Sequence, residues 1–194
     1  MNRITSCLFP TLVLLASCKV PTNSPKAWVA GTLAGSGASG YLDAIGTRAQ
    51  FNKPYGVAVD RFGNVCVADY GNHSIRKITI SNSVNEVSTL AGSGAAGSVN
   101  GVGSAAQFND PNDVAVDRFG NVYVADYSNH RVRKITAEKR VSTLAGGDRS
   151  GYLDGAGISA RFFSPIGVAV DLEGSVYVTD FVNHRIRKLE YKTP

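Results

Sequence analysis

The chain contains three copies of one segment, and this internal repeat constrains the fold more than any single residue does. The copies occupy residues 32–79, 89–136 and 143–190. They begin at Thr32, Thr89 and Thr143, so the period is 57 and then 54 residues. Repeats of roughly this size are typical of solenoids, propellers and tandem arrays. Each copy is therefore expected to form one supersecondary unit that is stable only against its neighbours.

Within each copy the pattern predicts four β-strands. The first two strands are apolar at nearly every position, which indicates strands covered on both faces. They are predicted at residues 57–59 and 65–68, 114–116 and 122–125, and 168–170 and 176–179. A tight hairpin joins them, with Gly63, Gly120 or Gly174 where a left-handed residue is needed. Third strands are predicted at residues 75–78, 132–135 and 186–189, fourth strands at 87–91 and 141–145, and an extra fourth strand at the N-terminus, residues 28–34.

Four antiparallel strands per copy predict an all-β fold built of propeller blades. The connection to the next first strand spans 19 positions in every copy and ends at Pro54, Pro111 or Pro165. This length is ample for crossing about 15 Å from the outer to the inner edge of adjacent blades. The three extra residues of the first copy fall within residues 80–86 and are expected to lengthen the turn between its third and fourth strands. Because the crossovers stay constant in length, we expect binding on the face that carries them.

Three motifs recur in the same order and spacing: Pro-x-Gly-Val-Ala-Val-Asp, Gly-Asn-Val-Tyr-Val-Ala-Asp and Asn-His-Arg-Val-Arg-Lys-Ile. Together they resemble the NHL repeat over residues 28–190. The resemblance implies a β-propeller of four-stranded blades with three blades in this chain, which form either half of a six-bladed ring or an open arc. It does not fix a function, because NHL-type propellers include protein-binding ectodomains, RNA-binding proteins, sensor domains of bacterial kinases and a few lyases.

The N-terminus has the pattern of an export signal. Arg3 precedes an apolar stretch at residues 8–16 that is too short to span a bilayer. Leu15-Ala16-Ser17-Cys18 resembles the lipobox of bacterial lipoproteins. The resemblance implies a signal peptide at residues 1–17, a lipidated Cys18 followed by a tether through residue 27, and a place in the bacterial cell envelope. A plain secretory signal is the alternative.

Cys66 is the one cysteine that this reading leaves in the folded region, residues 28–190, which a short tail at 191–194 follows. Tyr123 and Tyr177 occupy its position in the other copies. A position shared with tyrosine favours packing, so we expect a buried, inert thiol.

The three histidines, His73, His130 and His184, suggest a metal site, because lyase relatives hold an ion with histidine at the propeller centre. They occupy one repeat position, however, at the turn before the third strand, which predicts that they lie off the axis and too far apart to share an ion. We therefore expect them to form hydrogen bonds within the turn. The repeated aspartates are expected to cap turns, the first set at hairpins and the second before the third strand: Asp60, Asp117 and Asp171; Asp69, Asp126 and Asp180.

Asn112-Asp113 is a departure near the predicted axis, because the other copies have Tyr55-Gly56 and Ile166-Gly167 there. A carboxylate at the channel mouth could bind a cation or polar ligand, but one carboxylate alone is no active site.

The third strands carry basic residues: Arg76 and Lys77; Arg131, Arg133 and Lys134; Arg185, Arg187 and Lys188. The net charge is only +5 and no aromatic residues alternate with the bases, so nucleic acid is not expected and solvated edge charge is predicted.

These observations favour an exported, membrane-anchored lipoprotein whose propeller is a non-catalytic binding module for a protein or glycan partner, without a cofactor. The alternative is a propeller lyase or lactonase-like hydrolase with a metal in the channel. Candidate binding residues are those of the crossover face: Asn112, Asp113, Asn72, His73, Asn129, His130, Asn183 and His184. A homodimer that completes a six-bladed ring is a further hypothesis, because the chain begins with a spare fourth strand and its third copy lacks one.

Overall fold

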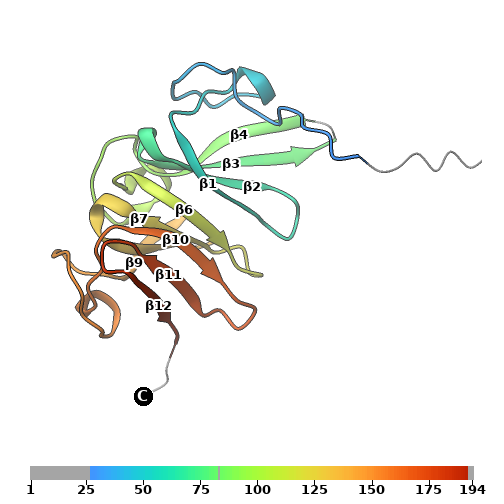
Figure 1. Cartoon of the computed structure of the whole chain (residues 1–194). Helices are drawn as coiled ribbons and strands as arrows, with labels where there is room; N and C mark the ends of the chain where they lie inside the picture. The colour runs from blue at the N-terminus through green and yellow to red at the C-terminus, as the bar shows by residue number, and fades with distance from the viewer. Residues whose placement is uncertain (1–26, 83, 192–194) are drawn as a thin grey trace, which may run out of the picture. The chain divides into compact units, whose positions relative to one another are not determined.

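The computed structural model describes residues 27–82 and 84–191. Every strand belongs to the compact unit that begins at Thr32. Within this unit, three antiparallel sheets follow one another along the chain as blades (Figure 1). The predicted signal peptide at residues 1–17 and the predicted lipidation site Cys18 lie outside the described residues.

The blades have the predicted strand order, from an inner first strand to an outer fourth strand. The first blade contains β1 (Pro54–Val59), β2 (Val65–Asp69), β3 (Ser74–Ser81) and β4 (Val84–Ala91). The second contains β6 (Pro111–Val116), β7 (Val122–Asp126), β8 (Arg131–Ile135) and β9 (Arg140–Ala145), and β5 (Gly101–Val102) adds a short fifth strand beside β9. Among the described residues, the third contains the three strands β10 (Pro165–Val170), β11 (Val176–Asp180) and β12 (Arg185–Leu189).

Short 3-10 helices occupy two repeated places. Three lie in the crossovers: η1 (Gly46–Arg48), η3 (Gly103–Ala105) and η5 (Gly157–Ser159). Two lie between the second and third strands of a blade: η2 (Tyr70–Asn72) and η4 (Tyr127–Asn129). The crossovers and η2 and η4 share one end of the blades, the crossover face. The hairpins at residues 60–64, 117–121 and 171–175 share the opposite end, the hairpin face, on the right of Figure 1.

Two details differ from the sequence-based expectations. Residues 28–34, predicted as a spare strand, form no strand, although the side-chain amide of Asn85 donates a hydrogen bond to the carbonyl of Leu33 at 3.0 Å. The extra residues of the first copy extend β3 and β4 as a paired hairpin, with Ile80 opposite Asn85 and Ser81 opposite Val84, so they lengthen the strands and not the turn.

The hydrophobic core lies between successive blades. One cluster joins Ile75 and Ala91 of the first blade to Val124 and Val141 of the second, and Phe108 of the crossover fills the space between them. A second cluster repeats this arrangement between the second and third blades. The prediction that the apolar strands are covered on both faces therefore holds for the second blade only, since the first and third blades each have a neighbour on one side.

Candidate functional site

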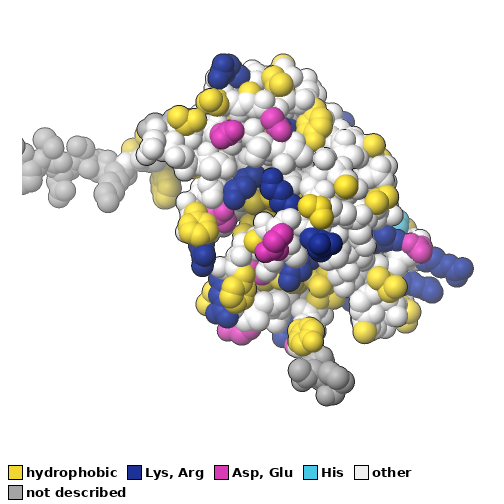
Figure 2. Space-filling view, turned by 180° about the vertical axis from the view of Figure 1, so that it is seen from behind, with side chains coloured by type: hydrophobic (Ala, Val, Ile, Leu, Met, Phe, Trp, Pro, Cys, Tyr) yellow, Lys and Arg dark blue, Asp and Glu magenta, His cyan; other side chains and the backbone are white. Residues whose placement is uncertain are grey.

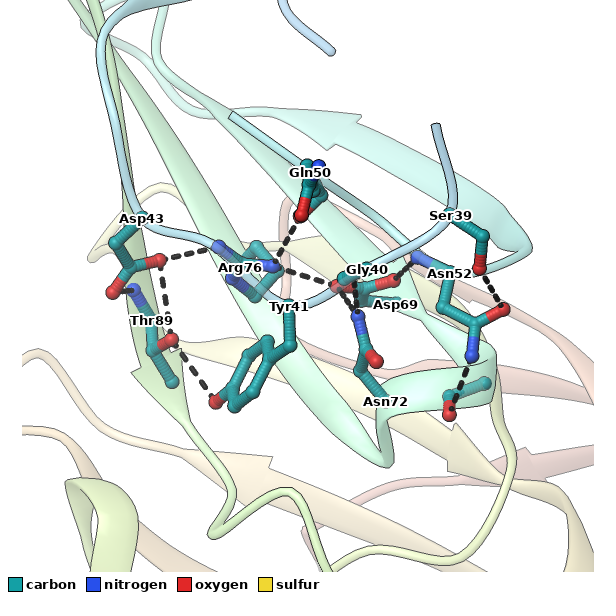
Figure 3. A network of polar contacts seen from close by, with 11 residues as sticks. Ser39, Gly40, Tyr41, Asp43, Gln50, Asn52, Asp69, Asn72, Arg76 and Thr89 are labelled. Carbon is teal, nitrogen blue, oxygen red and sulfur yellow. Dashed lines mark hydrogen bonds and ion pairs between the residues drawn. The ribbon is translucent and has the colours of Figure 1, made fainter. Parts of the chain in front are cut away.

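A buried polar network fastens each crossover to its blade, and Figure 3 shows the copy in the first blade. Asp69 ends β2 and is completely buried. Its carboxylate accepts hydrogen bonds from the backbone N–H of Asn52 (2.8 Å), the amide of Asn72 (2.8 Å) and the guanidinium of Arg76 (2.7 Å). Because Asn52 belongs to the crossover, Asp69 ties the crossover to β2 and β3.

Arg76 extends this network across the crossover. Its guanidinium donates to the backbone carbonyl of Gln50 (3.1 Å) and to the carboxylate of Asp43. It also lies over the rings of Tyr41 and Phe51, 4.8 and 5.2 Å from their centroids. A completely buried arginine is stable only when its charge and donors find such partners. We call the set formed by Asp69, Asn72, Arg76 and their crossover contacts the crossover clamp.

The other two blades repeat the crossover clamp. Asp126 pairs with Arg133 at 2.8 Å, and Asp180 pairs with Arg187 at 2.9 Å. The prediction of solvated edge charge is therefore wrong for these arginines, because they face the incoming crossover and not the solvent. The second set of aspartates does more than cap turns, because each carboxylate also forms a buried ion pair: Asp69, Asp126 and Asp180.

The candidate asparagines belong to the same clamps. Each side-chain amide donates to the aspartate of its blade and to a crossover carbonyl 2.7–2.8 Å away. The crossover carbonyls are those of Gly40, Gly97 and Gly151, and the asparagines are Asn72, Asn129 and Asn183. These amides therefore attach the crossovers to the blades; Asn72 is buried, and Asn129 and Asn183 are half-buried.

The histidines link neighbouring blades. Nδ1 of His73 accepts the backbone N–H of Asp110 at 3.1 Å, and Nδ1 of His130 accepts that of Ser164 at 3.1 Å. The backbone N–H of each histidine donates within its own turn, as expected, whereas these two side-chain bonds reach the next crossover. Burial lowers the pKa of His130, which favours the neutral imidazole that can accept this bond. His184 is exposed, and no blade follows it in the described chain.

Asp113 lies among the inner strands, as its repeat position predicts. Its Oδ2 accepts the backbone N–H of Val168 on β10 at 2.9 Å. On the other side, Asp113 Oδ1 lies so close to Gly56 of β1 that a side chain there would clash with it, since a Cβ at position 56 would be only 2.1 Å away. The carboxylate thus touches all three blades, while Asn112 beside it is half-buried.

The hairpin face carries large apolar side chains that the sequence analysis did not single out. Phe62, Phe119 and Leu172 are 71%, 67% and 75% exposed. The guanidinium of Arg61 lies 4.6 Å from the ring centroid of Phe62, and that of Arg118 lies 4.8 Å from the ring centroid of Phe119. Figure 2, seen from behind, shows hydrophobic and basic side chains alternating along the edge that carries the hairpins. A phenylalanine at the tip of a polar turn was the signal in the sequence that could have identified this face.

A cleft of about 170 Å³ opens on the hairpin face between the first and second blades. Its lining includes Phe62 and Phe119, together with Arg61, Cys66 and Lys77. Cys66 is 3% exposed, as expected of a packing position, and burial raises the pKa of its thiol to about 11. The cleft therefore offers aromatic and cationic contacts around a thiol that stays protonated.

The hairpin aspartates are turn caps, as predicted. Asp117 Oδ1 accepts the backbone N–H groups of Phe119 and Asn121, each at 2.9 Å, and Asp60 and Asp171 accept the equivalent pairs. Burial alone would raise the pKa of Asp117, but the hydrogen bonds from Asn121, Phe119 and Tyr123 together hold it below its ordinary value. These carboxylates are engaged within their turns.

Across residues 27–82 and 84–191, no three or more His, Cys, Asp or Glu side chains are grouped so that they could hold a metal ion. In the same part of the chain, no helix is long and apolar enough to cross a membrane.

Comparison with known proteins identifies the repeats. The NHL repeat model matches residues 51–78, 108–135 and 162–189. NHL repeat-containing protein 2 from Gallus gallus is 32% identical over 112 residues, which are 55% of this chain and 15% of that protein. The chain spans 9–15% of the length of the curated relatives it matches.

Two solved structures share the fold. A structure described as an auxiliary nutrient binding protein from Bacteroides thetaiotaomicron is 28% identical with a TM-score of 0.63, and the match covers 71% of this chain and 37% of that one. Another with the same description, from Bacteroides ovatus, is 26% identical with a TM-score of 0.65 and covers 74% and 38%. The three matched segments, the blade topology and these likenesses together show that the chain carries three NHL repeats, which form three β-propeller blades in the described residues.

Proposed function

We propose that this chain is a non-catalytic binding module that holds a partner protein with its hairpin face. The observation that carries the proposal is the pair of arginine-backed phenylalanines, Phe62 and Phe119, exposed at the cleft between the first and second blades. Aromatic and arginine side chains are enriched in protein interfaces and contribute most of their binding energy.

The internal hydrogen bonds support this assignment of roles. The polar residues of the repeat signature are used by the crossover clamps and by the bonds between blades. By contrast, the phenylalanine and leucine side chains at the hairpin tips are exposed to water, which lowers solubility. They are not part of the hydrophobic core. Such exposed apolar groups rimmed by polar residues are typical of interaction sites.

Two structural neighbours support a binding role. The two Bacteroides structures are described as auxiliary nutrient binding proteins, and both are more than 25% identical to this chain. A glycan is the other ligand class that the exposed rings could contact, through stacking on a sugar face. The partner protein is favoured because each ring is backed by a guanidinium, which suits a polypeptide with acidic groups.

The test uses residues 19–194, which contain every described strand, immobilised and incubated with an extract of the cell envelope. The unaltered protein should retain a specific partner that quantitative mass spectrometry identifies. The double variant Phe62→Ala/Phe119→Ala should lose at least about tenfold of it. Ile158→Ala is the matched control, because Ile158 is also 71% exposed but lies in η5 on the crossover face.

Retention of the partner by the double variant would contradict the proposed site. Binding of the unaltered protein to a defined oligosaccharide, with no protein retained, would replace the partner protein with a glycan.

We further propose that Cys18 anchors the module in the cell envelope by a lipid. The lipobox-like Leu15-Ala16-Ser17-Cys18 supports this part. Two or more acyl chains hold a protein stably, since each buried CH₂ contributes about 0.8 kcal/mol. Cys18→Ser should therefore move the protein from the detergent phase to the aqueous phase, and a variant that stays in the detergent phase would refute the anchor.

A further inference from the structure

The first blade leaves its inner strand, β1, uncovered on one side of the sheet. We call this side the leading face and define it by Phe51, Tyr55, Val57 and Val59. Val57 is 61% exposed, although its equivalents in the second and third blades, Val114 and Val168, are 3% and 8% exposed. Those two valines are covered by the preceding blade. The leading face therefore has the side chains of a blade interface, but no blade precedes it among the described residues.

The third blade leaves the opposite side of its sheet uncovered. We call this side the trailing face and define it by Ala169, Tyr177 and Ile186. Ile186 is 72% exposed, whereas its equivalents Ile75 and Val132 are both 0% exposed beneath the next blade. Tyr177 is 37% exposed, against 5% for Tyr123. The trailing face thus matches the surfaces that the first two blades bury.

The third blade also lacks the strand that the N-terminal segment could supply. β3 pairs with β4 and β8 pairs with β9, but no fourth strand pairs with β12 among the described residues. Thr32-Leu33-Ala34-Gly35 repeats the sequence at the ends of β4 and β9, residues 89–92 and 143–146. In the single chain this segment forms no strand and Leu33 is exposed.

The hydrogen bond that joins a histidine to the next blade also has an unpaired counterpart, whose donor and acceptor lie at opposite ends of the described chain. His73 and His130 accept backbone N–H groups from Asp110 and Ser164 of the following crossover. The equivalent acceptor, His184, lies at the trailing end, and the equivalent donor, Lys53, lies at the leading end. Lys53 already has the left-handed backbone of its two equivalents, with φ of 50° against 54° and 53°. The backbone of Lys53 therefore already has the conformation of a residue that donates to a histidine, and the corresponding histidine lies at the other end of this chain.

We infer that two copies of this chain close one ring of six blades, in which the leading face of each copy packs on the trailing face of the other. A second copy is the occupant that supplies every missing part at once: the apolar side chains, the strand beside β12 and the histidine for Lys53. Two such contacts related by a two-fold axis leave neither face exposed. Three blades per copy give a ring within the usual range of about four to eight. The hairpin face lies at one end of this ring and stays free to bind a partner.

Light scattering on residues 19–194 tests the inference. At micromolar concentration the unaltered protein should have twice the mass of one chain. Val57→Asp alters the leading face and Ile186→Asp alters the trailing face, and each variant alone should be a monomer. Both positions are exposed in the single chain, so circular dichroism should show that each variant stays folded.

A mixture of the two variants gives the sharpest result. The leading face of Ile186→Asp and the trailing face of Val57→Asp are both unaltered, so the mixture should regain a dimer through one contact. Ile158→Asp is the matched control and should remain a dimer, because its equivalent Ser104 stays exposed in the second blade. In the unaltered protein, amide hydrogen exchange at residues 32–34 should be at least about tenfold slower than in Ile186→Asp.

An unaltered protein that is a monomer at this concentration would overturn the inference. So would a dimer that persists in both aspartate variants, or an open series of larger oligomers in place of a closed pair.

Discussion

Replacing Arg133 with methionine tests whether the crossover clamp stabilises the fold. Arg133 is 0% exposed, and its guanidinium donates to the carboxylate of Asp126 (2.8 Å), the carbonyl of Gln107 (3.0 Å) and the side chain of Asn100 (2.8 Å). Methionine keeps much of the volume but leaves the buried carboxylate of Asp126 without its cation. Breaking a buried ion pair on one side costs about 3–5 kcal/mol, a large part of the about 5–15 kcal/mol that stabilises an ordinary domain.

The assay is urea unfolding of residues 19–194 followed by circular dichroism. With a slope of about 1–3 kcal/mol per molar urea, the midpoint should fall by at least about 1 M. Arg118→Met is the matched control, because Arg118 is exposed at a hairpin tip, and it should change the free energy of unfolding by less than about 0.5 kcal/mol. Equal losses in the two variants would refute the assignment of a stabilising role to the buried arginine.

Three further outcomes are expected. Gly120 has φ of +84°, so Gly120→Val should strain the hairpin and destabilise the protein by about 1–3 kcal/mol, and an unchanged melting temperature would contradict the turn. The pKa of Asp117 lies below 3.8 in the folded protein, so its contribution to stability is present above that pH and is lost as the pH falls further; Asp117→Asn should flatten this part of a pH–stability curve. The thiol of Cys66, buried and with a pKa of about 11, should resist alkylation at pH 8 until urea unfolds the protein, and rapid labelling of the folded form would refute its burial.

The internal repeat made the fold predictable from the sequence. The direction in which each polar side chain points was not predictable. Apolar runs and glycine turns fix strands and hairpins locally, so β1, β2 and the left-handed Gly63 follow from a few residues each. The burial of Arg76 depends on Gln50 and Asp43, which lie 26 and 33 residues earlier in the crossover. Nothing in the Arg-Lys sequence of the third strand distinguishes the inward arginine from the accessible lysine.

The candidate site likewise combines features that neighbouring residues in the sequence determine with features that depend on distant parts of the chain. The inner position of Asp113 was predictable because it replaces a glycine of the repeat, but its bond to Val168 joins two blades 55 residues apart. The exposed Phe62 and Phe119 were overlooked, since in the sequence each belongs to a turn whose other residues are polar. Only the assembled blades bring the two rings to one cleft.

Site-specific photo-crosslinking in the producing cells tests the proposed binding face most directly. A photoreactive phenylalanine analogue at position 119 keeps the aromatic ring at the hairpin tip, and the same analogue at position 158 probes the equally accessible crossover face. We expect a crosslinked partner protein from position 119 and none from position 158. Crosslinks from position 158 without any from position 119 would contradict the proposed binding face.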